Sequence, residues 1–206
     1  IWYISKEDRE LSLFMNNSWQ TVYLLNISYP LSSLEADLNG NPLAYIEFPT
    51  SELEPREILS YQVNYHVILK QRTLSQIFEN RSGSFKDIPN NLKLMFCSPI
   101  GPWQSDNPVI YSLAYEIAEN ETKVLSVLSD FILWIAQNIK YESLDVPRYP
   151  NETLLGKKGD CDDQANLLIG LCRAVGIPAY LQIGCIYEPG AESTSIPMFV
   201  TSMLGK

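Results

Sequence analysis

The sequence predicts an α+β protein in which an N-terminal antiparallel β-sandwich precedes a domain of helices and strands. Before about residue 71, apolar and polar residues alternate in short runs separated by turn signals, as they do in half-buried strands. After residue 108, apolar residues recur at helical spacing. The chain has 206 residues, of which 46% are hydrophobic, and this suits one or two globular domains.

The strands of the first domain follow from alternation and from one turn. Residues 19–27 and 59–69 alternate between apolar and polar side chains, which predicts strands buried on one face. The runs at 34–38 and 42–48 flank Asn39-Gly40, a pair that tolerates the positive φ angles of a tight hairpin turn. Several short strands joined by turns are typical of a sandwich, and we expect this domain to cover residues 1–78.

The next segment is rich in Asn, Ser, Gly and Pro. It covers residues 79–107 and contains one short apolar run, residues 92–96, so we expect a structured linker that packs between the domains. The second domain is then expected at residues 108–206.

Two helices open the second domain. The first is expected over residues 109–118, and the second follows a cap at Asn120 or Thr122. The apolar stripe of the second helix comprises Val124, Val127, Leu128, Phe131, Ile132, Ile135 and Ile139. Trp134 is expected in the core, with the edge of the active-site cleft as the alternative. Tyr141 is a candidate for the cleft edge or for an oxyanion donor, with a core position as the alternative.

A cysteine then begins the central helix. Asp160 is a favourable N-cap for a helix that starts at Cys161, because its carboxylate accepts from unpaired N–H groups of the first turn. The helical stripe is Cys161, Ala165, Leu168, Cys172 and Val175, widened by Ile169 and Leu171. Gly176 and Pro178 end the helix, and residues 179–187 read as a strand. The preceding residues 142–158 read as a long loop that forms one cleft wall.

The start of a helix is a chemically favourable place for a thiol. The helix dipole and the unpaired N–H groups stabilise thiolate, and at such positions the pKa of a thiol falls from about 8.5 to between roughly 3.5 and 7.5. The same N–H groups stabilise the oxyanion that forms when a carbonyl is attacked. The aspartates around Cys161 oppose a thiolate, so a cationic partner is required. The alternative is a small buried residue at the start of a core helix.

The motif around this cysteine resembles the transglutaminase-like superfamily of papain-fold thiol enzymes. The resemblance lies in Gly159-Asp160-Cys161-Asp162-Asp163-Gln164-Ala165, followed by Leu171-Cys172-Arg173-Ala174-Val175-Gly176-Ile177-Pro178-Ala179, and extends over residues 108–187. It implies that Cys161 is the catalytic nucleophile of a cysteine protease or acyltransferase working through a thioester. The β-rich residues 19–69 resemble, more weakly, the sandwich that precedes this domain in prokaryotes.

The resemblance also implies a histidine base and an orienting aspartate after the strand, and there the sequence departs from the family. No histidine follows Cys161, and the single histidine, His66, lies on the polar face of a predicted strand. We therefore expect an incomplete papain-like domain, inactive by itself. The alternatives are a non-catalytic module of the same fold that binds a peptide or partner chain, and a cell-surface adhesion domain.

Composition excludes several functions. The net charge of −9 and the lack of basic clusters argue against nucleic acid as a partner. No apolar run is long enough for a membrane span. Asp160, Asp162 and Asp163 lack the ligand spacing of a calcium loop, so no metal and no cofactor are expected. The expected partner is a protein or peptide substrate; the oligomeric state is open.

The other cysteines and the asparagines bear on location. Cys172 and Cys185 are expected to be buried thiols, and at most one disulfide is open to Cys97, Cys172 and Cys185 if Cys161 is the nucleophile. Acceptor patterns for N-glycosylation occur at Asn16, Asn26, Asn80, Asn120 and Asn151. Their number favours an extracytoplasmic protein, with a cytoplasmic one and chance occurrence as the alternative.

Overall fold

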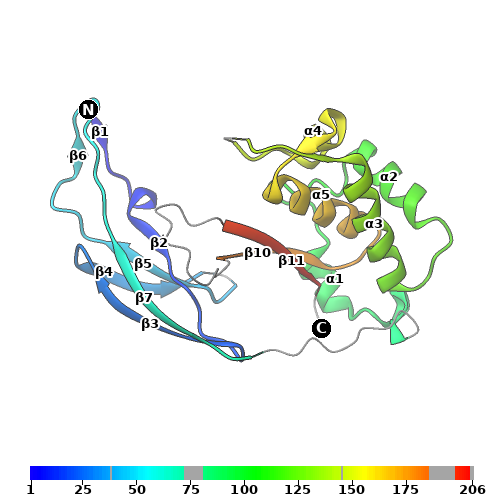
Figure 1. Cartoon of the computed structure of the whole chain (residues 1–206), viewed down its shortest axis with the longest axis horizontal. Helices are drawn as coiled ribbons and strands as arrows, with labels where there is room; N and C mark the ends of the chain where they lie inside the picture. Colours follow the sequence, from blue (N-terminus) through cyan, green and yellow to red (C-terminus); the bar gives the residue numbers. More distant parts are fainter. Residues whose placement is uncertain (38, 72–80, 145, 186–197, 205–206) are drawn as a thin grey trace. The chain divides into compact units, whose positions relative to one another are not determined.

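The computed structural model describes residues 1–37, 39–71, 81–144, 146–185 and 198–204, with side chains described up to residue 184. The chain divides into two compact units, Ile1–Ser75 and Gln76–Lys206. Figure 1 shows strands in the first unit and mainly helices in the second. The α+β class predicted from the sequence is therefore confirmed.

The first unit is built from antiparallel strands. They are β1 (Trp2–Tyr3), β2 (Glu10–Ser12), β3 (Gln20–Ile27), β4 (Leu31–Ala36), β5 (Pro42–Ile46), β6 (Glu52–Leu53) and β7 (Val63–Leu69). In the described part of this unit, β5 lies between β2 and β4, β3 pairs with β7, and β1 pairs with β6. The antiparallel pairing is as predicted, and the sandwich packing of these sheets stays a prediction.

The predicted hairpin turn joins β4 to β5. Gly40 has a φ of +81°, the left-handed conformation that its lack of a Cβ permits. The Asp37 side chain accepts from the N–H groups of Asn39 at 2.7 Å and Asn41 at 2.8 Å. These bonds fix the register in which Ala36 faces Pro42.

In its described part, the second unit contains five α-helices, one 3-10 helix (Phe85–Asp87) and four strands. The helices are α1 (Asn90–Phe96), α2 (Pro108–Ala118), α3 (Val124–Asn138), α4 (Pro150–Gly156) and α5 (Cys161–Ala174). The strands are β8 (Lys140–Tyr141) and β9 (Lys158–Gly159), which are parallel, and β10 (Ala179–Cys185) and β11 (Met198–Leu204), which are antiparallel. None of the described helices is both long and apolar enough to cross a bilayer.

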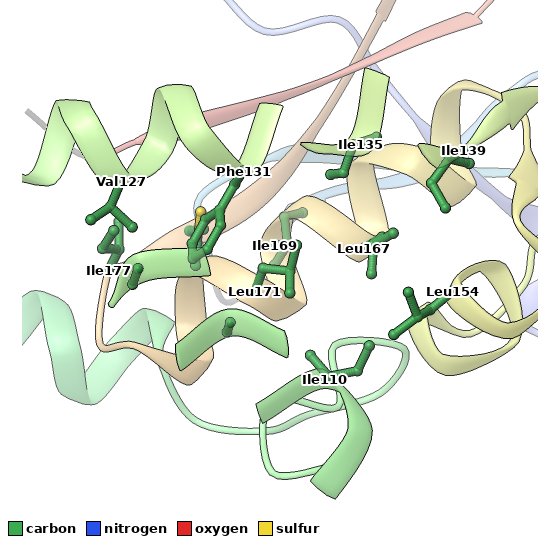
Figure 2. Packing of buried hydrophobic residues seen from close by; sticks show 14 residues of the cluster. Ile110, Val127, Phe131, Ile135, Ile139, Leu154, Leu167, Ile169, Leu171 and Ile177 are labelled. Carbon is green, nitrogen blue, oxygen red and sulfur yellow. The ribbon is translucent and has the colours of Figure 1, made fainter. Parts of the chain in front are cut away.

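Helix α5 is the centre of this unit. It contacts α2, α3 and α4 as well as β10 and β11. Figure 2 shows Leu167, Ile169 and Leu171 of α5 among side chains from the neighbouring helices, and all three are fully buried. The predicted stripe is buried or half-buried, and Leu167 outside it is buried as well, because other elements pack on more than one face of α5.

Residues 90–96 form α1 within the segment expected to be a structured linker. Two predictions about local structure were wrong. Residues 150–156 form α4 inside the expected loop, with Pro150 at its first position. The N-cap of α3 is Lys123 rather than Asn120 or Thr122, and Ser82 Oγ accepts from the Leu125 N–H at 2.9 Å. A cap supplied from a distant residue leaves no local sequence signal.

The stripe on α3 is confirmed with one exception. Val127, Phe131 and Ile135 are buried, whereas Ile132 is 50% exposed. Pairs three and four residues apart share a helix face, and Ile132 lies at the margin of the apolar face. The core cluster of the unit joins these residues of α3 to α2 and α5.

Candidate active site

Cys161 is the first residue of α5, as predicted. Asp160 is the N-cap, in extended conformation, and the side chains of Asp160 and Asp163 form a capping box around the first turn. The Cys161 side chain is half-buried. The thiol therefore lies at the positive end of a fourteen-residue helix, where the helix dipole favours a negative charge.

Asp163 is buried completely in the first turn of the same helix. Its side chain is 0% exposed. One carboxylate oxygen accepts from the Arg148 N–H at 2.6 Å, and the other accepts from the Asp160 N–H at 3.3 Å. A buried carboxylate requires such partners, because desolvation without hydrogen bonds is costly. The sequence showed only a negative charge near the helix start; it did not show this pair of contacts.

The Asp163 side chain also explains why residue 159 is a glycine. A Cβ built on Gly159 would lie 2.6 Å from Asp163 Cβ and 2.9 Å from its Oδ2. Real Cβ atoms do not approach other atoms so closely, so only glycine fits beside Asp163. In the Gly-Asp-Cys sequence, close packing thus explains the glycine, and capping of the helix explains the aspartate.

The segment before α4 is held against these residues. Tyr141 of β8 pairs with Gly159 of β9, and the Glu142 N–H donates to the Gly159 carbonyl at 3.2 Å. The Leu144 N–H donates to Asp160 Oδ2 at 3.2 Å. We call residues 141–144 and 146–148 the wall segment. In Figure 1 the chain between α3 and α4 passes the N-terminal end of α5.

The acidic groups beside the thiol share a proton. Burial, a hydrogen bond to Asp160 and the charges of Asp160 and Asp163 raise the pKa of Asp162 to about 6. Burial opposes ionisation of Asp160 too, but the hydrogen bonds from Asp162 and from the Leu144 N–H outweigh burial and lower the pKa of Asp160. As the pH rises, Asp160 therefore loses its proton first and Asp162 follows around pH 6, so that both are mainly charged at pH 7.

The same cluster contains potential metal ligands. An oxygen of Asp160, an oxygen of Asp162 and the Cys161 Sγ lie within 4.8 Å of one another. Exposed acidic groups are common without an ion, and the Asp160 carboxylate is bonded to the Leu144 N–H. We assign no metal to this cluster.

The remaining predicted residues lie in several environments. Tyr141 is 64% exposed, so its side chain is outside the core while its backbone lies beside Gly159. Trp134 is half-buried, with the Lys157 ammonium 4.6 Å from its ring centre. His66 is exposed on β7 in the first unit, which confirms the prediction of a solvated sheet histidine.

The other cysteines differ from Cys161. Cys172 is 1% exposed, and burial raises the pKa of its thiol to about 12, as expected of an inert core thiol. Cys97 is half-buried after α1, and burial raises the pKa of its thiol as well. Cys185 ends β10, and its side chain lies outside the described residues.

The candidate asparagines for glycosylation differ in exposure. Asn16, Asn26 and Asn120 are exposed, whereas Asn80 lies outside the described residues. Asn151 is half-buried in α4 with a buried Oδ1, and the hydroxyl-bearing Thr153 of its pattern is 0% exposed. Asn151 is therefore less accessible to a glycosylating enzyme than the three exposed asparagines, because α4 packs on α5.

One buried polar cluster was missed by the sequence analysis. The Trp103 indole N–H donates to Asn166 Oδ1 at 2.9 Å, and the Arg173 guanidinium lies 4.5 Å from the Trp103 ring centre. Arg173 also donates to the Ala179 and Ser98 carbonyls, each at 2.8 Å. These contacts join the segment before α2 to α5 and β10. The polar residues inside the apolar run of α5 were the signal that could have shown them.

Residues 111–202 match the family model of the transglutaminase-like superfamily. The matched range contains α3, α4 and α5 with Cys161. No curated protein matches the chain.

Two solved structures are similar to the chain. One is a "putative cysteine protease" from Cytophaga hutchinsonii, with a TM-score of 0.63 and 20% identity, covering 95% of this chain and 67% of that one. The other is a "putative protease" from Parabacteroides distasonis ATCC 8503, with a TM-score of 0.38 and 14% identity, covering 90% of this chain and 35% of that one. At 20% identity, the first likeness shows the fold alone.

Proposed function

We propose, from the membership of residues 111–202 in the transglutaminase-like superfamily, that Cys161 is the nucleophile of a thiol acyl-transfer enzyme. Its Sγ attacks the carbonyl carbon of a peptide, isopeptide or glutamine amide bond. A C–S bond forms, the C–N bond breaks, and the nitrogen accepts a proton and leaves as an amine, or as ammonia from a glutamine side chain. Water or a second amine then attacks the thioester and releases the thiol.

The position of Cys161 on α5 carries this proposal. A helix N-terminus presents unsatisfied N–H groups and a positive dipole end, which stabilise both a thiolate and an oxyanion. Among the cysteines with described side chains, Cys161 begins a helix, whereas Cys172 is sealed in the core. Cys97 follows a helix C-terminus, where the dipole disfavours a negative charge.

The base and the orienting acid are supplied, in this proposal, by sequence beyond Lys206. The family places a histidine and an aspartate after the strand that follows the cysteine helix, whereas the histidine of this chain, His66, is exposed in the first unit. Asp160, Asp162 and Asp163 oppose a thiolate, so an imidazolium near the thiol is required. The chain spans about two thirds of the length of the similar Cytophaga protein, which carries additional sequence.

One sequence feature favours a second candidate function. With no histidine after Cys161, the fold could serve as a module that binds a peptide or partner chain without cleaving it. The substrate class in either case is a protein or peptide. The exposed Asn16, Asn26 and Asn120 support the further proposal of an extracytoplasmic location.

Turnover by the full-length protein separates the two functions. The protein is incubated with casein, with and without dansylcadaverine as amine acceptor. Release of acid-soluble peptides reports hydrolysis, and fluorescence incorporated into casein reports amine transfer. We expect one of these activities, its loss in Cys161→Ala, and its retention in Cys97→Ser. Activity that persists in Cys161→Ala contradicts the proposal, and casein binding without either product supports the binding module instead.

A further inference from the structure

We propose that Asp163 is a positioning residue: its carboxylate holds the wall segment against the start of α5, so that a polypeptide acyl donor lies in register with Cys161 Sγ. This inference rests on the proposed function of Cys161. It assigns substrate alignment to a side chain that does not itself touch the reacting atoms.

The first observation is the pair of donors that the Asp163 carboxylate joins. One oxygen is bonded to the Arg148 N–H at 2.6 Å and the other to the Asp160 N–H at 3.3 Å. Arg148 ends the wall segment, and Asp160 is the residue before Cys161. A single buried group therefore connects the wall segment directly to the backbone that presents the thiol.

The second observation is a further connection on the opposite side of Cys161 in the sequence. Asp160 Oδ2 accepts from the Leu144 N–H at 3.2 Å. The residues that flank Cys161, one before and two after, thus hold the wall segment at Leu144 and at Arg148. A segment fastened at two points loses less conformational entropy when a substrate binds than a segment fastened at one point.

The third observation is what the fastened segment exposes. Val146 is 71% exposed, and Ser143 and Pro147 are exposed as well. An exposed apolar side chain next to backbone groups suits contact with an extended polypeptide, which offers side chains and amide groups together. A small electrophile makes no such contacts, so its reaction with Cys161 does not depend on the wall segment.

The substitution Asp163→Asn tests this connection with little change of shape. Asparagine keeps one acceptor oxygen, but its NH₂ group replaces the other oxygen and faces an N–H donor. One of the two connections is therefore lost. Removal of a carboxylate near the thiol also removes repulsion of the thiolate, so an effect on the thiol alone would raise its reactivity. The two effects have opposite signs.

The experiment uses the full-length protein and two alkylating probes, iodoacetamide and iodoacetylated tryptic peptides of casein. For the wild type we expect the rate of Cys161 alkylation to saturate with the peptide probe. For Asp163→Asn we expect the half-saturating peptide concentration to rise at least fivefold, while the rate with iodoacetamide does not fall. Asp130→Asn, an exposed site on α3, serves as the matched control and is expected to behave as the wild type.

Protection of Cys172 reports folding in every variant, because this thiol is 1% exposed. If Cys172 of Asp163→Asn is alkylated, Arg148→Pro replaces it, since proline removes the donor N–H and leaves Asp163 intact. The inference is overturned if a folded variant saturates like the wild type, if both probes slow equally, or if the wild type shows no saturation. Slow iodoacetamide alkylation of wild-type Cys161 contradicts the proposed function instead.

Discussion

The side chain of Asp163 occupies the space that a Cβ on Gly159 would need, at 2.6 Å from the Asp163 Cβ. Both residues belong to the short stretch that presents Cys161. The backbone of β9 and the first turn of α5 are thus packed directly on one another, and the position of the thiol depends on a residue without a side chain.

We expect Gly159→Ala to destabilise the second unit by roughly 1–3 kcal/mol, the usual cost of forcing an extra methyl group into a packed region. Gly184→Ala is the matched control, because nothing lies within 4 Å of a Cβ built there. Urea unfolding of both variants measures the free energies. Equal stabilities of the two variants would show that the start of α5 has room for the methyl group.

Arg173 is expected to stabilise the second unit through the contacts of its planar guanidinium and not through its charge alone. Its guanidinium donates to two carbonyls and stacks on Trp103, and lysine lacks the planar group that makes these contacts together. We expect Arg173→Lys to cost about 1–3 kcal/mol through a buried unpaired carbonyl. The exposed Lys140 offers the reverse control: Lys140→Arg should change thermal stability little. If Arg173→Lys leaves the free energy of unfolding unchanged, the contacts assigned to Arg173 are contradicted.

The contribution of Asp162 to the stability of the second unit is expected to decrease as the pH rises from about 4 to about 6. The pKa of Asp162 is raised to about 6 in the folded protein from 3.8. A carboxyl group whose pKa is raised by folding stabilises the folded state fully at pH values below its pKa in the unfolded state. This stabilisation is lost as the pH rises to its pKa in the folded state. The size of the effect is on the order of 1 kcal/mol after screening by solvent.

Melting temperatures of the wild type and Asp162→Asn between pH 4 and pH 8 measure this contribution. The wild type should lose stability relative to Asp162→Asn between about pH 4 and pH 6. Parallel curves over this range would show that Asp162 titrates as an ordinary exposed carboxyl group.

Local signals in the sequence predicted the parts of the fold that depend on neighbouring residues. Asn39-Gly40 identified the turn between β4 and β5, and Asp160 with Gly176 identified the ends of α5 within about a residue. Alternation identified β3 and β7. In each of these cases the residues that determine the structure lie within a few positions of one another.

Contacts between distant residues could not be predicted in this way. The acceptor for the Leu125 N–H in the first turn of α3 is Ser82, and the partner of Asn166 is Trp103, sixty-three positions away. The sequence analysis placed Asp163 among the aspartates around Cys161, but the bond of Asp163 to the Arg148 N–H depends on the path of the chain through α4. The sequence thus identified Cys161 as the candidate nucleophile. The structure showed that Asp160 and Asp163 bind the wall segment beside it.

The central claim is that α5 presents Cys161 for attack on a carbonyl, and the most direct measurement is the rate of iodoacetamide alkylation of each cysteine in the full-length protein at pH 7. Peptide mass spectrometry after timed labelling gives these rates. We predict that Cys161 is alkylated at least tenfold faster than Cys97, Cys172 and Cys185. Alkylation of Cys161 at or below the rate of Cys97 would contradict the account.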